Sequence, residues 1–335
     1  MKARILKSVF IPYRPVHLIL HITNRCTLRC KTCFVTFDDV PDRELNLEEI
    51  NGIAKCLKKL IWLDISGGEP FLRSDLPDIC AAFDAKTIAI PTNGFDPPLI
   101  CETTKKIREG VSSEINISIS IDGFEPINDE IRGRGYFKKS IETVELLKRV
   151  PGIRIKVNTV LCNKNYAEII DFMKFVKGLG VDFQSVIFRR GSKVVAKPFE
   201  CPPYEELKRI KAEIFRIWGT YDYGFGAFES RILHNYQRAM YEASLRVIKE
   251  KKQVMRCLAG RRHLVIYADG SVSFCEVLPP FGNIRNERLP SLLKSKNAEK
   301  SRDLIAGRGC YCYHNCNMID NFFLNPLYYP RFLIG

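Results

Sequence analysis

Three cysteines near the N-terminus have a spacing that suits metal binding. The segment "HITNRCTLRCKTCF", residues 21–34, places Cys26, Cys30 and Cys33 in one short loop. Thiolates bind zinc and iron–sulfur clusters, and closed sites of both kinds take four protein ligands. Three cysteines leave one coordination position open, where a metal can bind a substrate or a cofactor. We therefore expect a metal centre that takes part in chemistry.

A second group of cysteines lies near the C-terminus. Cys257 precedes two predicted strands, "HLVIY" and "SVSFC", which Asp269 and Gly270 join in a hairpin turn. The second strand ends at Cys275. The segment "GCYCYHNCN" supplies the remaining members, which are Cys310, Cys312 and Cys316. This group indicates a second metal site, either an iron–sulfur cluster or a zinc knuckle with His314 as a ligand.

The composition favours metal chemistry over disulfide bonds. The chain has 335 residues and 13 cysteines, whereas disulfide frameworks are typical of small secreted domains. Its apolar runs are shorter than the roughly 18–20 residues that a membrane span needs. Its basic beginning, "MKARILKSVFIPYRP", contains prolines and does not look like a signal peptide. These features predict a cytoplasmic protein, with a peripheral position at the membrane as the alternative.

The net charge restricts the partners only weakly. A formal charge of +14 is compatible with an anionic substrate, a membrane surface or an acidic redox partner. A solvated basic surface explains it equally well. No basic run is interleaved with base-stacking aromatic residues, so we expect no nucleic-acid partner. Cations beside aromatic rings at both chain ends suit a membrane surface, but docking of the C-terminal tail on the protein is favoured.

Strands alternate with helices through the first 190 residues. The predicted strands are 16–23, 61–66, 86–92, 113–120, 153–162 and 181–188. Most are separated by predicted helices, among them 45–60 with Asn46 as N-cap and 74–85 with Ser74 as N-cap. Such a series implies a parallel sheet with right-handed crossovers, open or curled into a barrel. The site then lies at the C-terminal strand ends, where the cysteine loop, "SGGEP", "TNG" and "SIDG" follow the first four strands.

Two of these turns together resemble the radical S-adenosylmethionine (radical SAM) superfamily. The resemblance rests on the three-cysteine loop and on Gly67-Gly68-Glu69-Pro70, and it covers roughly residues 15–190. It implies a partial (β/α)6 barrel and a [4Fe–4S] cluster on Cys26, Cys30 and Cys33. The fourth iron would bind the amino and carboxylate groups of S-adenosylmethionine. One electron would then cleave this cofactor to methionine and a 5′-deoxyadenosyl radical.

The resemblance also implies which residues bind the cofactor. They are Gly67, Gly68, Glu69, Asn93, Ser120, Arg132 and Asn158. Glycines let a backbone approach a ligand closely, and Glu69 would accept a hydrogen bond near the amine. Arg132 suits a bidentate contact with the carboxylate, with a surface salt bridge as the alternative. Asn158 shares one strand face with Arg154 and Lys156, which places them inside the barrel. No catalytic residue is assigned.

The C-terminal cysteines resemble the auxiliary-cluster domains called SPASM and Twitch. A full SPASM domain holds two [4Fe–4S] clusters on about seven cysteines, whereas five are present here. The resemblance therefore implies one auxiliary [4Fe–4S] cluster that assists electron transfer. Its expected ligands are Cys257, Cys275 and Cys316, with either Cys310 or Cys312 as the fourth. The zinc knuckle ranks second, because the first cysteine group already implies iron–sulfur chemistry.

These expectations combine into an α/β fold with a small C-terminal domain. Its predicted parts are an N-terminal extension (1–14), the barrel (15–190), a helical connector (191–256), an auxiliary-cluster domain that starts with a β-hairpin (257–316) and an aromatic tail (317–335).

The predicted function is hydrogen-atom abstraction from a small molecule, sugar or lipid. Only about twenty residues precede the cysteine loop, which argues against the leader-binding domain common in peptide-modifying relatives. A maturase of a peptide or protein is the alternative. A non-enzymatic electron carrier is less favoured, because it would not need the "GGEP" and "SIDG" turns. A flavodoxin or ferredoxin would supply electrons. The substrate and the reaction subtype are left open.

Overall fold

A single curved sheet organises the chain in this computed structural model. The structure describes residues 14–33, 35, 44–188, 199–307, 310–313 and 315–334. Within these ranges the strands are β1 (His17–Thr23), β2 (Lys59–Gly67), β3 (Asp84–Thr92), β4 (Glu114–Ser120), β5 (Ile153–Val160), β6 (Phe183–Ile187), β7 (His263–Ile266), β8 (Ser271–Ser273) and β9 (Gly282–Asn283). They follow the order β6-β5-β4-β3-β2-β1-β7-β8-β9. The N-terminal extension lies almost wholly outside the described residues.

The first six strands are parallel, and each pairs with its neighbour in sequence. The predicted partial (β/α)6 barrel is therefore confirmed. The predicted C-terminal hairpin is also present, because β7 and β8 pair in antiparallel fashion. Strand β7 lies parallel to β1, with His263 opposite His17, so the hairpin extends the barrel sheet. The domain boundaries at residues 190 and 256 remain predictions.

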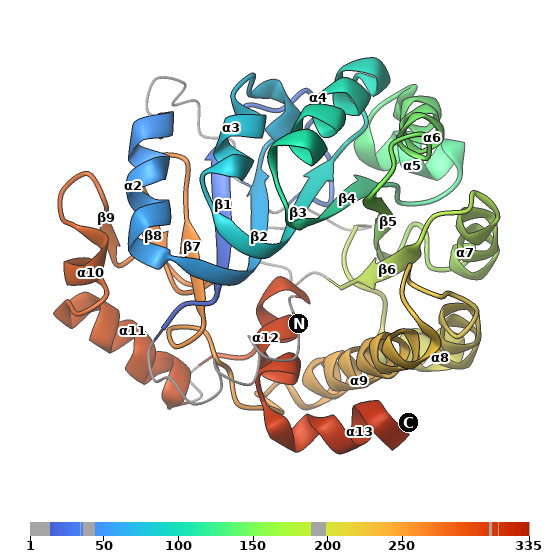
Figure 1. The fold of residues 1–335 in the computed structure, drawn as a ribbon. Coiled ribbons are helices and arrows are strands. Elements are labelled where there is room, and N and C mark those ends of the chain that lie inside the picture. Colours follow the sequence, from blue (N-terminus) through green and yellow to red (C-terminus); the bar gives the residue numbers. More distant parts are fainter. Residues whose placement is uncertain are drawn as a thin grey trace.

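Helices cover both faces of the sheet. The described α-helices are α2 (Leu47–Leu57), α3 (Leu76–Ala81), α4 (Pro97–Gly110), α5 (Glu125–Arg132), α6 (Tyr136–Leu147), α7 (Ile169–Gly178), α8 (Tyr204–Trp218), α9 (Ala227–Glu250), α10 (Leu289–Leu292), α11 (Lys296–Ala306), α12 (Asn315–Phe323) and α13 (Tyr329–Ile334). Two 3-10 helices, η2 (Pro70–Leu72) and η3 (Pro326–Tyr328), complete the set. Helices α2 to α7 pack on the convex side, while α9 and α12 lie across the concave side (Figure 1).

One of the two predicted helix caps is confirmed, and the other is wrong. Asn46 caps α2, because its side chain accepts a hydrogen bond from Glu49 N in a capping box. Ser74 does not cap α3, which begins at Leu76 with Asp75 in the N-cap position. A cap at Ser74 would place Pro77 third in the helix, and proline has no N–H to donate to the serine. Helix α5 was not predicted.

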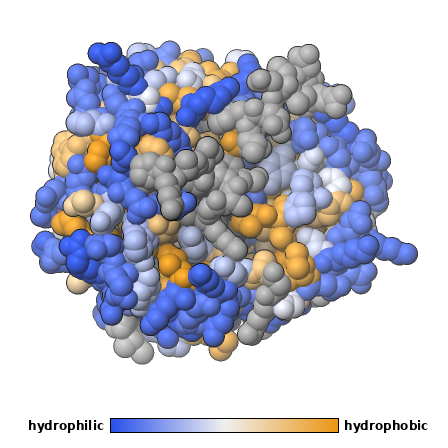
Figure 2. All heavy atoms as spheres, turned by 180° about the vertical axis from the view of Figure 1, so that it is seen from behind, coloured by the Kyte–Doolittle hydropathy of each residue, from blue (hydrophilic) through white to orange (hydrophobic). Residues whose placement is uncertain are grey.

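The aromatic tail packs against the protein. Phe322, Phe323 and Phe332 form a buried cluster with Tyr236 and Met240 of α9, in agreement with the docking expected from the sequence. No described helix is long and apolar enough to cross a membrane. Hydrophilic side chains cover most of the face seen in Figure 2, and apolar ones gather there in smaller groups.

Candidate active site

The two glycines after β2 pack against the start of the cysteine loop. Gly68 N donates to Thr23 O at 2.8 Å. A Cβ on Gly67 would lie 2.2 Å from Thr23 O, and one on Gly68 would lie 2.1 Å from Arg25 O. Gly67 also has a φ of +123°, a conformation that favours glycine. The space that we expected to admit a ligand thus holds the backbone of the cysteine loop.

Glu69 and Asn93 join the turns after β2 and β3 to the same loop. Glu69 is buried, and its Oε2 accepts a hydrogen bond from Asn93 N at 2.7 Å. Asn93 Nδ2 donates to Thr27 Oγ1 at 3.0 Å and approaches Cys26 Sγ at 3.6 Å. Burial raises the pKa of Glu69 to about 7, although the backbone N–H groups of Asn93 and Phe71 act in the opposite direction. This network fixes the first cysteine relative to the sheet.

Arg132 reaches the loop from the end of α5. Its Nη2 forms an ion pair of 2.9 Å with Asp122 Oδ2, and both side chains are almost completely buried. Its Nη1 lies 3.9 Å from Cys30 Sγ. The alternative of a surface salt bridge is therefore wrong for Arg132. From the sequence, Asp122 was interpreted only as part of a turn. Its position directly after a buried strand could have indicated that it has a buried partner.

The thiols of Cys26 and Cys30 are not activated by their surroundings alone. Burial raises the pKa of Cys26, and it raises the pKa of Cys30 to about 11 despite the nearby Arg132 guanidinium. Metal binding would displace these protons. No three described cysteines have sulfur atoms that all lie within 4.8 Å of one another. In a single tetrahedral zinc site the sulfurs would stand only about 3.8 Å apart, so no three described thiols are arranged as one zinc site.

A cavity of about 370 Å³ opens inside the barrel below these residues. Ser120 and Asn158, which are paired in register between β4 and β5, line it together with Arg132. Arg132 Nε and Asn158 Oδ1 are buried atoms without a hydrogen-bond partner in the described structure. They offer a donor and an acceptor to a polar cofactor. The predicted cofactor residues thus fall into two sets, one around the cysteine loop and one along the cavity wall.

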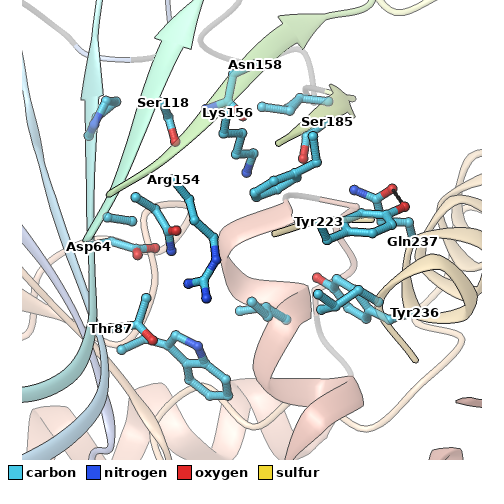
Figure 3. Close-up of a pocket in the computed structure, with 18 of the residues that line it drawn as sticks. Asp64, Thr87, Ser118, Arg154, Lys156, Asn158, Ser185, Tyr223, Tyr236 and Gln237 are labelled. Atoms are coloured by element: carbon cyan, nitrogen blue, oxygen red, sulfur yellow. Dashed lines mark hydrogen bonds between the residues drawn. The ribbon is translucent and has the colours of Figure 1, made fainter. Parts of the chain in front are cut away.

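The cavity has a polar wall and an aromatic floor. Arg154 and Lys156 of β5 point into it, while Tyr223, Tyr236 and Gln237 face them from the opposite side (Figure 3). Tyr223 Oη donates to Gln237 Oε1 at 2.9 Å. The segment 221–228 contributes Tyr223 and Phe225 to the lining.

Two cations of β5 and the carboxylate of Glu114 line one side of the cavity, and the acids Asp64, Glu229 and Glu276 line it elsewhere. Arg154 Nη1 lies 3.3 Å from Glu114 Oε2, and its guanidinium stacks 3.7 Å from the centroid of Phe225. Glu114 also pairs with Lys86 at 2.5 Å, so one carboxylate is shared between two cations. Lys156 adds a further cation on the same strand face. This wall suits an anionic group.

A buried acid completes the lining on the side of the C-terminal hairpin. Glu276 directly follows Cys275 and is 6 % exposed. His21 Nε2 lies 3.1 Å from Glu276 Oε1. The sequence analysis missed this pair, although His21 interrupts an apolar strand and Glu276 follows a predicted ligand. Glu276 therefore connects the cavity wall to the second cysteine group.

The second cysteine group converges at the end of β8. Burial, together with the nearby thiols of Cys310 and Cys312, raises the pKa values of Cys257 and Cys275 to about 12. The structure thus brings four of the five predicted cysteines together. The side chain of Cys316 and all of His314 lie outside the described residues. The choice of four cluster ligands remains a prediction.

Comparison with known proteins identifies the family. Residues 20–176 match the model of the radical SAM superfamily, and residues 257–317 match that of the SPASM iron–sulfur cluster-binding domain. The chain belongs to the radical SAM superfamily and carries a C-terminal SPASM domain. It is accordingly an enzyme that uses S-adenosylmethionine, a [4Fe–4S] cluster and an auxiliary iron–sulfur cluster.

Individual relatives differ in what they act on. A probable GTP 3′,8-cyclase of Archaeoglobus fulgidus is 27% identical over 267 residues, which cover 77% of this chain and 85% of the relative. The antilisterial bacteriocin subtilosin biosynthesis protein AlbA of Bacillus subtilis is 25% identical over 301 residues, 85% of this chain but only 61% of the relative. The crystal structure of Streptococcus suis SuiB bound to the precursor peptide SuiA has a TM-score of 0.64 at 16% identity, covering 98% of this chain and 78% of SuiB. This last likeness concerns the fold alone.

Metal analysis tests the two cysteine groups. Anaerobic reconstitution should give about eight irons per chain, four for each cluster. Replacing Cys26, Cys30 and Cys33 together with alanine should leave about four. Cys56→Ala is the matched control, because Cys56 is an exposed cysteine outside both groups, and it should keep the full iron content. Zinc in place of iron at the C-terminal cysteines would contradict an auxiliary cluster.

Proposed function

We propose that this enzyme removes a hydrogen atom from a small molecule with an anionic group and an apolar part, bound in the barrel cavity. The cavity itself carries the proposal. It extends from the predicted cofactor residues Ser120 and Asn158 to a floor formed by α9 and α12. Its volume of about 370 Å³ is at the lower end of the range for small-molecule sites.

The residues of the cysteine loop and the cavity wall would hold the reactive groups. Cys26, Cys30 and Cys33 would bind the cluster, while Arg132 and Asn158 would bind the polar parts of S-adenosylmethionine. When bound and reduced by a flavodoxin or ferredoxin, the cluster and S-adenosylmethionine together supply a radical that abstracts a hydrogen atom. The floor of α9 and α12 would exclude water from the reacting centre.

The two walls would orient the substrate. Arg154 and Lys156 would bind its anionic group, and stacking on Phe225 holds the Arg154 guanidinium in place. The aromatic side chains of the floor would bind its apolar part. Glu276, a buried carboxylate in the cavity wall, would accept a proton from the substrate. The auxiliary cluster would accept or relay an electron.

Deuterium transfer tests this function even while the substrate is unidentified. Cells are grown in D2O and their extract is divided into anionic small molecules, other small molecules and peptides. Each fraction is incubated with the reduced enzyme and S-adenosylmethionine, and 5′-deoxyadenosine is analysed by mass spectrometry. We expect deuterium in this product only with the anionic small molecules.

Arg154→Gln separates substrate binding from cofactor cleavage. The variant should lose about tenfold or more of the deuterium transfer, since one charge-assisted contact contributes about 1.5–3 kcal/mol. Its slow cleavage of S-adenosylmethionine without substrate should stay unchanged. Arg209→Gln, at an exposed pair on α8, is the matched control. Transfer that is equally strong in Arg154→Gln would contradict the anion site.

A peptide substrate is the second candidate. Among the similar proteins, AlbA is named for the biosynthesis of a bacteriocin, and SuiB has been crystallised with a precursor peptide. The cavity would then hold a single acidic side chain rather than a whole molecule. Deuterium transfer from the peptide fraction alone would favour this function over the first.

A further inference from the structure

Three buried side chains converge on one point beneath the barrel. His17 lies at the start of β1, His263 at the start of β7, and Asp320 in α12. Each is at most 1 % exposed. The Nδ1 atoms of the two histidines lie 3.2 Å apart. Each of them also lies 3.1 Å from Oδ2 of Asp320.

The triangle brings two ring nitrogens and a carboxylate unusually close together. Each Nδ1 atom carries either a proton or a lone pair in the ring plane. If both nitrogens donate to Asp320, His17 can use Oδ1 and His263 can use Oδ2, with the two N–H groups side by side at a nitrogen separation of 3.2 Å. If His263 accepts from His17 instead, its Nδ1 lone pair faces a carboxylate oxygen at 3.1 Å. The first arrangement crowds two donors together, and the second leaves a repulsive contact in a site that excludes water.

A metal ion bound by all three atoms would use the same close approach without crowding two donors. Zinc binds histidine nitrogen at about 2.0–2.1 Å and carboxylate oxygen at about 2.0–2.2 Å, so its tetrahedral ligands stand about 3.3 Å apart. The three separations of 3.1, 3.1 and 3.2 Å are close to that value. An ion about 1 Å out of the plane of the three atoms would satisfy all three bond lengths.

We infer that His17, His263 and Asp320 form a structural zinc site. Both oxygens of Asp320 lie 3.1 Å from His17 Nδ1, so the carboxylate can supply a second oxygen as the fourth ligand. The other nitrogen of His17, Nε2, lies 3.1 Å from Asp64 Oδ2. A carboxylate on the far nitrogen of a metal-bound histidine is the usual support for such a ligand.

The position of the site explains what the zinc would do. It would join β1, β7 and α12, which are far apart in sequence and together close one side of the barrel. Helix α12 supplies Ile319 and Phe323 to the cavity floor. The ion would therefore hold the floor against the sheet. Its complete burial excludes the water or substrate that a catalytic zinc needs.

The enzyme with both clusters loaded is the material for the test. After anaerobic purification and dialysis against a chelator, iron and zinc are counted, and X-ray absorption at the zinc edge reports the ligands. We expect about one zinc per chain with nitrogen and oxygen ligands only, at about 2.0–2.2 Å. No retained zinc and no uptake of one added equivalent would overturn the site. Sulfur ligands at about 2.3 Å would place the zinc at cysteines and overturn it equally.

Variants assign the ligands. His263→Gln should abolish zinc retention while the iron content stays the same. Asp64→Asn should weaken zinc binding by about 10–100-fold, as expected for a supporting carboxylate. His234→Gln is the matched control, because this half-buried histidine of α9 bonds to the backbone carbonyl of Phe215. Equal zinc retention in His263→Gln and His234→Gln would contradict the assignment, and the wild-type spectrum decides the matter if a variant fails to fold.

Discussion

Replacing Gly68 with alanine is expected to remove the N-terminal cluster and, with it, the cleavage of S-adenosylmethionine. The added Cβ would lie 2.1 Å from Arg25 O and 2.6 Å from the carbonyl carbon of Arg25. Both atoms belong to the backbone directly before Cys26, so the cysteine loop would have to move. The iron content should fall from about eight to about four per chain, and 5′-deoxyadenosine should not form.

Gly52→Ala provides the matched control for this prediction. Gly52 lies in α2, and a Cβ at this position would meet nothing within 4 Å. Alanine is also a better helix former than glycine, so the variant should keep all its iron and its activity. If Gly68→Ala retained about eight irons but lost cofactor cleavage, the glycine would contact the cofactor rather than support the cysteine loop.

The glycines of the "GGEP" turn show what a sequence motif can predict and what it cannot. The "GGEP" turn and the cysteine loop together correctly indicated the superfamily, and period-two and period-3.6 patterns correctly indicated a parallel sheet of alternating strands and helices. The motif did not reveal which neighbour requires the glycines, since that depends on the approach of Arg25 from another strand end. A local pattern specifies the backbone conformation, but not the segment that packs against it.

The buried polar contacts were missed for a related reason. Sequence periodicity placed Asn158 and Arg154 on the inner face of one strand, where the structure has them. It could not pair Asp122 with Arg132 or His17 with Asp320, because these partners come from elements that meet only in the folded barrel. Polar residues in buried strands indicate that partners exist, but their identity depends on tertiary packing.

Conversely, the cysteine groups were recognisable because their chemistry is concentrated in short segments. Cys26, Cys30 and Cys33 lie within eight residues of one another. Cys257 and Cys275 lie farther along the chain from Cys310 and Cys312. The hairpin between Cys257 and Cys275 could nevertheless be predicted from its Asp-Gly turn. The four meet because β7 pairs with β1 and places the hairpin beside the barrel.

Neutralising Asp122 should destabilise the enzyme more than any single surface change. Asp122→Asn keeps the oxygen that accepts from Val160 N at 2.7 Å but removes the charge opposite Arg132. A buried guanidinium then lacks its carboxylate, which costs about 3–5 kcal/mol of unfolding free energy. Urea denaturation of the cluster-loaded protein, followed by circular dichroism, measures the difference.

The double variant Asp122→Asn/Arg132→Met identifies the cause. Removing both charges should restore much of the lost stability, because an uncharged Asn–Met pair avoids the burial of an unpaired ion. Glu102→Gln is the matched control, since its pair with Lys105 is exposed and should change the unfolding free energy by about 0–1 kcal/mol. Equal instability of the single and double variants would assign the effect to the packing of Asp122 rather than to its charge. The double variant should nevertheless bind S-adenosylmethionine more weakly, because Arg132 also lines the cavity beside Asn158. Its stability would then recover while its affinity for the cofactor would not.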